Sequence, residues 1–389
     1  MKGGSVAAVV DSDQHLYESR LLWSEHIDPS ARDDALRIED DELGYPWLTW
    51  RGRRISLADV QLPGDTAAIG RHRQRRRQGL APEYRYDEVL PTDYWEPGAR
   101  GRRLEEMGLD AAVVFPNYGL LWERPLSGSL PALTANMTAW NRWCAEIGPA
   151  SGGRLFPVGH LTLRDGAWAE DQISRLAAAG VGLAMIAPAP VDGRPLSDRA
   201  HDRMWRAFVD HGVTPVFHVA DQTRIFDDAW YTDEGDSLAP VMEAVFLYTA
   251  PAVAVTDLIV NGAFERHPGL RVGIVELSSV WVPQYLLMLD GGWDFTNRLN
   301  GRAPAGLTRR PSEYFVDHVR VSSFSYEGPA RLTAQAGDVF MCCSDYPHSE
   351  GTATPLADYR VAGCSPEAQP GLFGTNLTAL LGAGGTGGP

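Results

Sequence analysis

Short runs of apolar residues recur along this chain, and the segments between them carry apolar residues at helical spacing. This alternation is typical of βα units, in which a buried strand is followed by a helix that covers the sheet. We count eight such runs, the number of parallel strands that closes a (β/α)8 barrel. The predicted strands are Val6–His15, Ala111–Pro116, Leu155–Leu163, Val181–Pro188, Thr214–Ala220, Leu270–Leu277, His318–Ser323 and Val339–Asp345.

Several gaps between these runs predict helices of the outer ring. Segments 168–179 and 197–211 each carry an apolar stripe and are followed by a glycine. A helix is also expected at 280–289, with a loop over 291–311 after it. The apolar stretch 244–264 contains proline and polar residues, and it predicts a pair of buried helices and not a membrane span.

The first gap is far longer than a usual βα connection, so it must contain structure of its own. Residues 45–57 predict a β-hairpin within it. A loop that follows a barrel strand emerges at the catalytic face, so we interpret 19–105 as a cap or lid. We therefore expect one barrel over residues 1–383, closed by a short helix at 372–381, with a disordered tail at 384–389.

The composition excludes some classes of function. The chain of 389 residues has a formal net charge of −15, which argues against general affinity for nucleic acid. Its one basic run, Arg71–Arg77, predicts a solvated helix face or, alternatively, a surface for an acidic substrate or partner. The four cysteines lack the spacing of a disulfide framework or a zinc site and are interpreted as reduced thiols. No apolar leader opens the sequence, so we expect a cytoplasmic protein.

Polar residues stand where the predicted strands end, which is where barrel enzymes place their chemistry. Asp13 and His15 alternate along the first strand and therefore point to the same side, offering an oxygen and a nitrogen ligand to a divalent ion. His218 closes the fifth strand, Glu276 the sixth and Asp345 the eighth. The coincidence of these strand ends points to one shared site. Further candidates are His160, Arg320 and His348.

At these residues the chain resembles the amidohydrolase superfamily. Within it, the chain is similar to the amidohydrolase-related group that includes the aminocarboxymuconate-semialdehyde, resorcylate and carboxyvanillate decarboxylases. The resemblance runs from about residue 7 to residue 383. It rests on the segments VVDSDQHLYE at 9–18, PVFH at 215–218, GAFERHPGLRV at 262–272 and SDYPH at 344–348.

The resemblance implies a single divalent ion, with Zn²⁺ expected and Mn²⁺ as the alternative, held by Asp13, His15, His218 and Asp345. Most relatives have His or Glu at the position of Asp13. The better-known decarboxylases have a histidine at the end of the sixth strand, where this chain has Glu276. A carboxyl there must have its pKa raised before it can donate a proton near neutral pH. Glu276 is alternatively a proton acceptor or a metal ligand.

Three functions remain open from the sequence. The first hypothesis is metal-dependent hydrolysis of an acyl bond, with Asp345 as general base and Glu276 or His348 as a second acid or base. The substrate is expected to be small and anionic or aromatic, with Arg320 and His160 binding it. The second hypothesis is non-oxidative decarboxylation of an aromatic or unsaturated acid. The third is a decayed barrel that acts as a binding protein. The resemblance also implies a homodimer.

Overall fold

The computed structural model describes residues 8–220, 226–230, 240–302 and 307–381. The predicted disordered tail, 384–389, and the first two residues of the strand predicted from Val6 lie outside these ranges.

Eight parallel strands form one sheet in the order β1-β5-β6-β7-β8-β9-β10-β11. This confirms the predicted (β/α)8 barrel. Each strand overlaps its predicted run, and most are shorter than predicted. The strands are β1 Val10–Leu16, β5 Ala111–Pro116, β6 Leu155–His160, β7 Leu183–Met185, β8 Thr214–Phe217, β9 Val272–Ile274, β10 Val319–Ser323 and β11 Phe340–Cys342.

The barrel closes where its first and last strands meet. Gln14 and Tyr346 form a parallel bridge there. His15 N–H donates to the Tyr346 carbonyl at 2.8 Å, and Asp345 N–H donates to the Asp13 carbonyl at 2.9 Å. Three of the residues in these backbone hydrogen bonds, Asp13, His15 and Asp345, are also predicted metal ligands.

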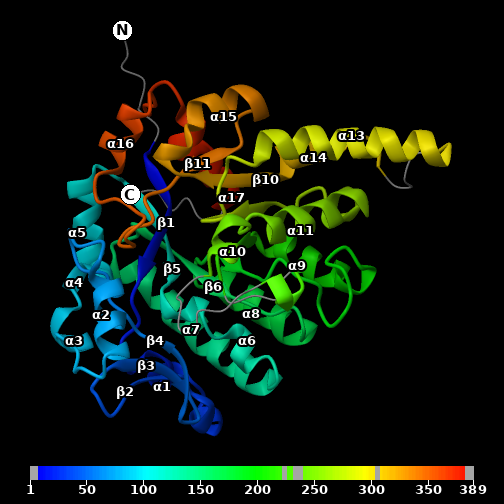
Figure 1. Cartoon of the computed structure of the whole chain (residues 1–389). Helices are drawn as coiled ribbons and strands as arrows, with labels where there is room; N and C mark the ends of the chain where they lie inside the picture. Colours follow the sequence, from blue (N-terminus) through cyan, green and yellow to red (C-terminus); the bar gives the residue numbers. More distant parts are fainter. Residues whose placement is uncertain (1–7, 221–225, 231–239, 303–306, 382–389) are drawn as a thin grey trace.

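Helices surround the sheet, as Figure 1 shows. The predicted helices at 168–179 and 197–211 are confirmed as α8 and α9. Asp165 caps α8 by accepting from Trp168 N–H, and α9 ends at Gly212 with a φ of 66°. The longer helices are α5 Pro97–Met107, α7 Leu130–Ala150, α8 Gly166–Ala178, α9 Asp202–His211, α11 Thr249–Val260, α13 Val282–Asn300, α14 Pro311–His318, α15 Pro329–Ala336 and α16 Pro355–Val361.

Helix α2 Ala68–Arg77 belongs to the insertion after β1, and shorter elements connect the other helices. The shorter elements are α1 Leu22–His26, α3 Tyr86–Val89, α4 Thr92–Trp95, α6 Glu123–Leu126, α10 Val241–Val245, α12 Ala263–Arg266 and α17 Asn376–Leu381, with the 3₁₀ turns η1 Pro29–Asp34, η2 Tyr118–Leu120, η3 Arg199–His201, η4 Asp228–Trp230 and η5 Ser325–Glu327 and the π turn η6 Gly371–Thr375. The predicted closing helix is thus split between η6 and α17. The Thr214 hydroxyl at the start of β8 donates to the Leu380 carbonyl at 2.5 Å, so α17 covers the amino-terminal end of the barrel.

The apolar stretch 244–264 is helical as predicted, but it contributes to three helices, α10, α11 and α12, and not to two. Helices α11 and α12 contain buried residues, whereas α10 contains none. Within the described residues, no helix is both long enough and apolar enough to cross a membrane. All four cysteines are buried and form no disulfide.

One predicted loop is wrong. Helix α13 does not end near residue 289 but continues to Asn300, through Gly291 and Gly292. Two glycines inside a helix cost roughly 2 kcal/mol relative to alanine. Here the side chain of Arg310 donates to both Asp290 and Asp294, at 2.9 Å each. These contacts tie two turns of α13 to the start of α14, which offsets the low helix propensity of the glycines.

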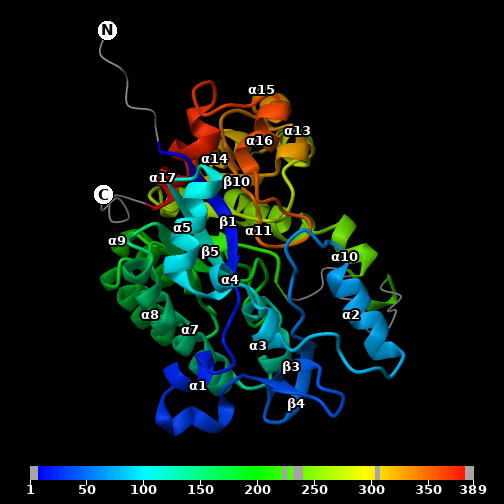
Figure 2. The same ribbon diagram turned by 90° about the vertical axis from the view of Figure 1, so that its left-hand side faces the viewer.

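The long insertion after β1 contains a second, antiparallel sheet. Strands β3 Pro46–Trp50 and β4 Arg53–Leu57 form the predicted hairpin, and β2 Arg37–Asp40 adds a third strand that was not predicted. Figures 1 and 2 both show this sheet at the end of the molecule toward which β1 runs. The insertion therefore lies on the side of the barrel where the strand ends place their polar residues.

The basic run forms helix α2 of this insertion, in line with the helical interpretation. Arg71 is paired with Asp65 and Arg73 with Asp59. The guanidinium of Arg76 lies 4.6 Å from the centre of the Trp47 ring. These contacts show arginines of the run holding the insertion together.

Glu18 ties the insertion to the barrel. Its buried carboxylate accepts the backbone N–H of Tyr118 at 2.9 Å and of Gly119 at 2.8 Å, just after β5. Burial raises the pKa of Glu18 to about 7, although these hydrogen bonds act in the opposite direction.

This raised pKa predicts a loss of stability as the pH rises. Between the ordinary glutamate pKa and about pH 7, the unfolded chain releases the Glu18 proton while the folded chain retains it. The free energy of unfolding of the metal-free protein should therefore fall by about 3 kcal/mol over that interval through this group. Urea unfolding of wild type and Glu18→Gln at pH 5 and pH 8 measures it, because glutamine does not titrate.

A control variant separates titration from lost hydrogen bonds. The carboxylate of Glu96 also accepts two backbone N–H groups, those of Gly98 and Ala99, but it is partly exposed. Glu96→Gln measures the effect of that loss at each pH. A stability difference between wild type and Glu18→Gln that is the same at both pH values would contradict the prediction.

Candidate metal centre

Strand β1 presents Asp13 and His15 at one point. Both side chains are fully buried, and Asp13 Oδ1 lies 3.5 Å from His15 Nε2. His15 Nδ1–H donates to the carbonyl of Pro116 at 2.9 Å. A carbonyl can only accept, so the proton of the neutral ring is on Nδ1, and Nε2 presents its lone pair to the cluster.

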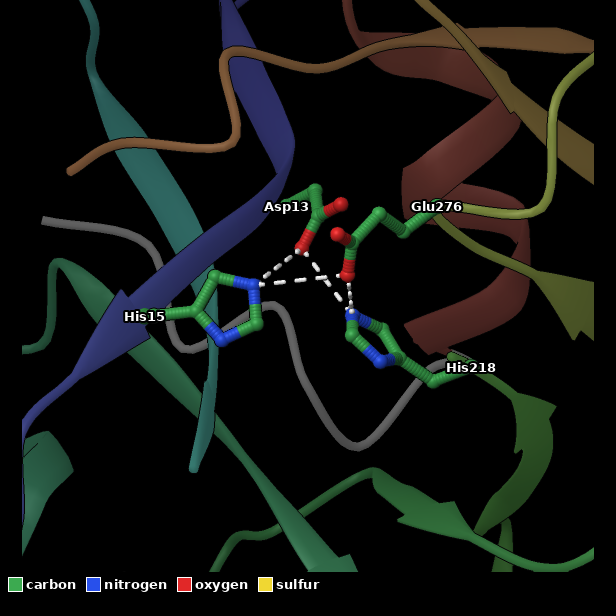
Figure 3. Close-up of side chains that lie close together, drawn as sticks. All are labelled: Asp13, His15, His218 and Glu276. Atoms are coloured by element: carbon green, nitrogen blue, oxygen red, sulfur yellow. Dashed lines mark hydrogen bonds and ion pairs between the residues drawn. The ribbon is translucent and has the colours of Figure 1, made fainter. Parts of the chain in front are cut away.

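His218 is oriented in the same way from the end of β8. Its Nδ1–H donates to the carbonyl of Val219 at 2.8 Å, which leaves Nε2 as the inward nitrogen. This nitrogen lies 3.4 Å from Asp13 Oδ1. Figure 3 shows both imidazoles turned toward the carboxylates of Asp13 and Glu276. Two histidines with their Nδ1 atoms bound to carbonyls and their Nε2 atoms converging have the arrangement that a metal ion requires.

Asp345 completes the cluster from the loop after β11. Its Oδ1 lies 3.1 Å from His15 Nε2 and 2.9 Å from His348 Nδ1. Burial opposes ionisation of this carboxyl, but the two imidazoles outweigh it and hold its pKa well below the ordinary range. Burial lowers the pKa of His15, but the neighbouring carboxylates of Asp13 and Asp345 outweigh burial. The pKa of His15 is therefore raised.

Glu276 enters the cluster from the turn after β9. Its Oε2 lies 3.2 Å from His218 Nε2 and 3.7 Å from His15 Nε2. Burial, and then the charges of Asp345 and Asp13, raise its pKa well above the ordinary value. Glu276 and Asp345 both have positive φ angles, of 56° and 54°. A non-glycine residue pays roughly 1–3 kcal/mol for such a conformation, so the surrounding structure must enforce it.

The donor set fits one divalent ion. Ligand atoms at about 2.1 Å from a tetrahedral ion lie roughly 3.4 Å apart. The contacts from His15 Nε2 and His218 Nε2 to the carboxylates of the cluster run from 3.1 to 3.7 Å. Within the described part of the chain, several of these buried atoms have no hydrogen-bond partner, which is costly unless an ion satisfies them. They are Asp13 Oδ2, His15 Nε2, Glu276 Oε2 and both oxygens of Asp345. A divalent metal site at this position is thereby supported.

The cluster has one open side. The side chains of Asp13, His15 and Asp345 are 0% exposed, whereas Glu276 is 12% and His348 is 13% exposed. Among these described residues of the cluster, Glu276 and His348 are thus the ones that solvent reaches.

Two predicted site residues do not join this cluster. Arg320 lies at the start of β10, where its Nη1 donates to the carbonyls of Val316 and Val319 at 2.8 Å each. This is the amino-terminal end of the strand, opposite the cluster, so the predicted contact with a substrate carboxylate is wrong. His160 does end β6 on the catalytic side, but its Nε2 lies 3.3 Å from Glu123 Oε2.

The structure adds two residues that were not predicted. Asn117 Oδ1 lies 2.8 Å from His348 Nε2, so it orients the ring that contacts Asp345. Glu327 accepts hydrogen bonds from Ser278 and Ser279, in the turn that carries Glu276. The sequence signal for Asn117 was its position directly after a predicted strand; Glu327 had no such signal.

Known proteins are similar to this chain in sequence and in fold. A family model described as Amidohydrolase matches residues 87–383. A search of curated proteins finds no match. An amidohydrolase from Mycobacterium avium subsp. paratuberculosis is 22% identical, with a TM-score of 0.78 over 97% of this chain and 100% of that chain.

Two decarboxylases of known structure share the fold. One is the 5-carboxyvanillate decarboxylase from Novosphingobium aromaticivorans, complexed with manganese and 4-hydroxy-3-methoxy-5-nitrobenzoic acid. It is 16% identical, with a TM-score of 0.66 over 96% of each chain. The other is a dihydroxybenzoic acid decarboxylase from Polaromonas sp. with bound manganese and the inhibitor 2-nitroresorcinol. It is 13% identical, with a TM-score of 0.57 over 96% of this chain and 97% of that chain.

Proposed function

The chain belongs to the amidohydrolase family, as its strand-end residues predicted, and from this premise we propose that it decarboxylates a small aromatic carboxylic acid with a divalent metal ion. Two structural neighbours with a stated reaction are decarboxylases with bound manganese and an aromatic ligand. They support decarboxylation over hydrolysis, which was the first hypothesis from the sequence. The converging donor set argues against the third hypothesis, a decayed site.

One observation of the structure carries the proposal. Glu276 places a carboxyl at the open side of the cluster, 3.2 Å from an imidazole that faces the same point. Decarboxylation leaves an electron pair on carbon that must receive a proton, so it needs an acid at this position. Hydrolysis first needs a base for water, a role that the sequence hypothesis gives to Asp345. The raised pKa of Glu276 agrees with the role of acid.

Each residue has a defined part in this reaction. Asp13, His15, His218 and Asp345 are the residues that would hold the ion, which supplies Lewis-acid polarisation of a substrate oxygen. The bond between the ring carbon and the carboxylate carbon breaks, CO₂ leaves and the electron pair stays on the ring. The carboxyl of Glu276 then transfers its proton to that ring carbon. Water, reaching the open side of the site, returns a proton to Glu276.

Carbon balance tests the proposed reaction. We expect the metal-loaded protein to convert at least one hydroxybenzoate of a panel into CO₂ and the corresponding phenol in equal amounts. The same panel should include amides, esters and lactones of similar size. Turnover of these acyl compounds without CO₂ release would replace decarboxylation by hydrolysis.

Removal of the metal should abolish activity and lower stability. An oxygen-rich set that also contains two imidazoles suits Mn²⁺ as well as Zn²⁺, and we propose Mn²⁺ first because the neighbours bind it. After chelation, we expect activity to fall about 100-fold or more and the melting temperature to drop. An ion at a thousandfold excess over its Kd stabilises the folded state by about 4 kcal/mol.

Separate addition of Mn²⁺ and Zn²⁺ to the chelated protein identifies the ion that restores activity. If the chelated protein keeps its full rate, the proposed metal dependence is wrong.

The insertion and the assembly complete the proposal. We propose that segment 19–105 forms a cap beside the open side of the site within one barrel over 1–383. Its backbone meets the barrel near the cluster, because the Tyr118 hydroxyl, one residue after Asn117, donates to the Asp59 carbonyl. A homodimer and a cytoplasmic location remain predictions from the sequence.

A further inference from the structure

The turn that carries Glu276 is held in an uncommon conformation. Glu276 and Ser278 both have left-handed backbone angles, with φ of 56° and 60°, although neither is glycine. L-amino acids avoid this region because Cβ approaches the following carbonyl oxygen. A turn with two such residues persists only when its surroundings enforce it, and it sets the direction in which the Glu276 side chain points.

A single buried carboxylate supports this turn. Glu327 Oε1 accepts the Ser278 hydroxyl at 2.6 Å and the Ser279 N–H at 3.0 Å. Glu327 Oε2 accepts the Ser279 hydroxyl at 2.8 Å and the Phe324 N–H at 2.9 Å. Glu327 is only 7% exposed, so all four donors meet it away from bulk water, where each hydrogen bond counts most.

Strand β10 contributes two further contacts from its last residues. The Ser322 hydroxyl accepts the backbone N–H of Glu276 itself at 2.9 Å, and the Ser323 hydroxyl lies 2.8 Å from the Ser279 hydroxyl. Together, the end of β10 and η5 form a polar cradle for the turn after β9. The strand from which Arg320 was predicted to act thus meets the turn through Ser322 and Ser323, and Glu327 contacts the turn from η5.

From this cradle we propose that Glu327 is a positioning residue, which fixes the turn 276–279 so that the carboxyl of Glu276 faces the imidazoles of the cluster. The inference rests on the proposed role of Glu276. Glu327 contacts the turn and not the substrate, so it acts on the reaction only through the position of Glu276. A contribution to folding alone would lower stability but would leave the position of the Glu276 carboxyl, and hence the chemical step, unchanged.

Glu327→Gln tests this role with little change in shape. The amide NH₂ of glutamine cannot accept, so two of the four donors lose their acceptor. We expect kcat of the metal-loaded variant to fall about 100-fold, as for a small misplacement of a reacting group, with KM within about twofold of wild type. The matched control is Asp257→Asn, because Asp257 of helix α11 likewise accepts both the N–H and the hydroxyl of a serine, Ser197. This control should keep wild-type kcat.

A readout independent of the reaction is the visible spectrum of the Co²⁺-loaded protein. Glu276 faces the donor atoms, so Glu276→Gln should alter the spectrum, Glu327→Gln should alter it in the same way, and Asp257→Asn should not. If these spectral changes appear but no variant or wild type releases CO₂, the positioning role stands and the proposed function fails.

A milder variant covers the case in which Glu327→Gln does not fold. Ser278→Ala removes one of the four donors and should give an intermediate loss of kcat and an intermediate spectral change. The inference is overturned if folded Glu327→Gln or Ser278→Ala keeps the wild-type spectrum and kcat while only its melting temperature falls.

Discussion

Replacing Asp345 by asparagine is expected to lower kcat about 1,000-fold and to weaken metal binding at least about 100-fold. The carboxylate lies 3.1 Å from His15 Nε2 and 2.9 Å from His348 Nδ1, and it is fully buried. The two imidazoles keep its pKa low despite burial, so it carries a full negative charge into the site. Asparagine keeps the shape but removes that charge. Metal content after dialysis and steady-state kinetics measure both effects.

The control for this variant is an aspartate in a similar contact elsewhere. Asp202 Oδ1 lies 3.1 Å from His267 Nε2 and also pairs with Arg266. Asp202→Asn should reduce stability modestly and leave kcat and metal content unchanged. If Asp345→Asn retains the metal and a wild-type rate, Asp345 does not belong to the donor set.

Glu276→Gln is expected to lower kcat by about 10²- to 10⁴-fold, the usual contribution of a general acid. Four other donors remain, so the variant should still bind metal. Burial and the charges of Asp345 and Asp13 raise the pKa of Glu276, so the carboxyl keeps its proton to a higher pH than an ordinary glutamate. Activity that needs this proton falls as the pH rises through that pKa. Glutamine does not titrate, so this alkaline fall should be absent from the residual activity of the variant.

A glutamate on the outer ring provides the comparison. Glu146 Oε1 lies 3.2 Å from His26 Nε2, near the surface, and Glu146→Gln should behave as wild type in rate and pH profile. A Glu276→Gln variant that releases CO₂ within about threefold of the wild-type rate would remove Glu276 from the proton transfer. The search for the acid would then move to His348, the other partly exposed residue of the cluster.

Most of the barrel was predictable because its strands are buried on both faces and therefore appear as short apolar runs between turns. Strand β1 illustrates this, since all of its residues are buried, including the polar ones. Helix α13 was mispredicted because Gly291 and Gly292 favour a loop locally. Its continuation depends on Arg310, which contacts it from a later segment of the chain. A contact of this kind leaves no local pattern in the sequence.

The candidate metal ligands could be predicted wherever the end of a strand could be predicted. Asp13, His15, His218 and Asp345 each follow or end an apolar run. The structure groups the first three with Glu276, and it groups Asp345 with His15, Glu276 and His348. The prediction for Arg320 was wrong because β10 begins at Val319. Arg320 is the second residue of this strand and therefore lies at the end of the barrel opposite the cluster. Glu327 was not found because it lies in a short turn and acts only through serines of another loop.

The seam between β1 and β11 has a consequence for how the protein is made. Asp345 N–H reaches the Asp13 carbonyl across that seam, and the neighbouring contact from Ser344 N–H to Asp11 Oδ1 joins residues 333 positions apart. During synthesis, Asp13 and His15 leave the ribosome long before Asp345. A nascent chain therefore holds half a donor set, and it can capture an ion firmly only after the last strand has docked beside the first.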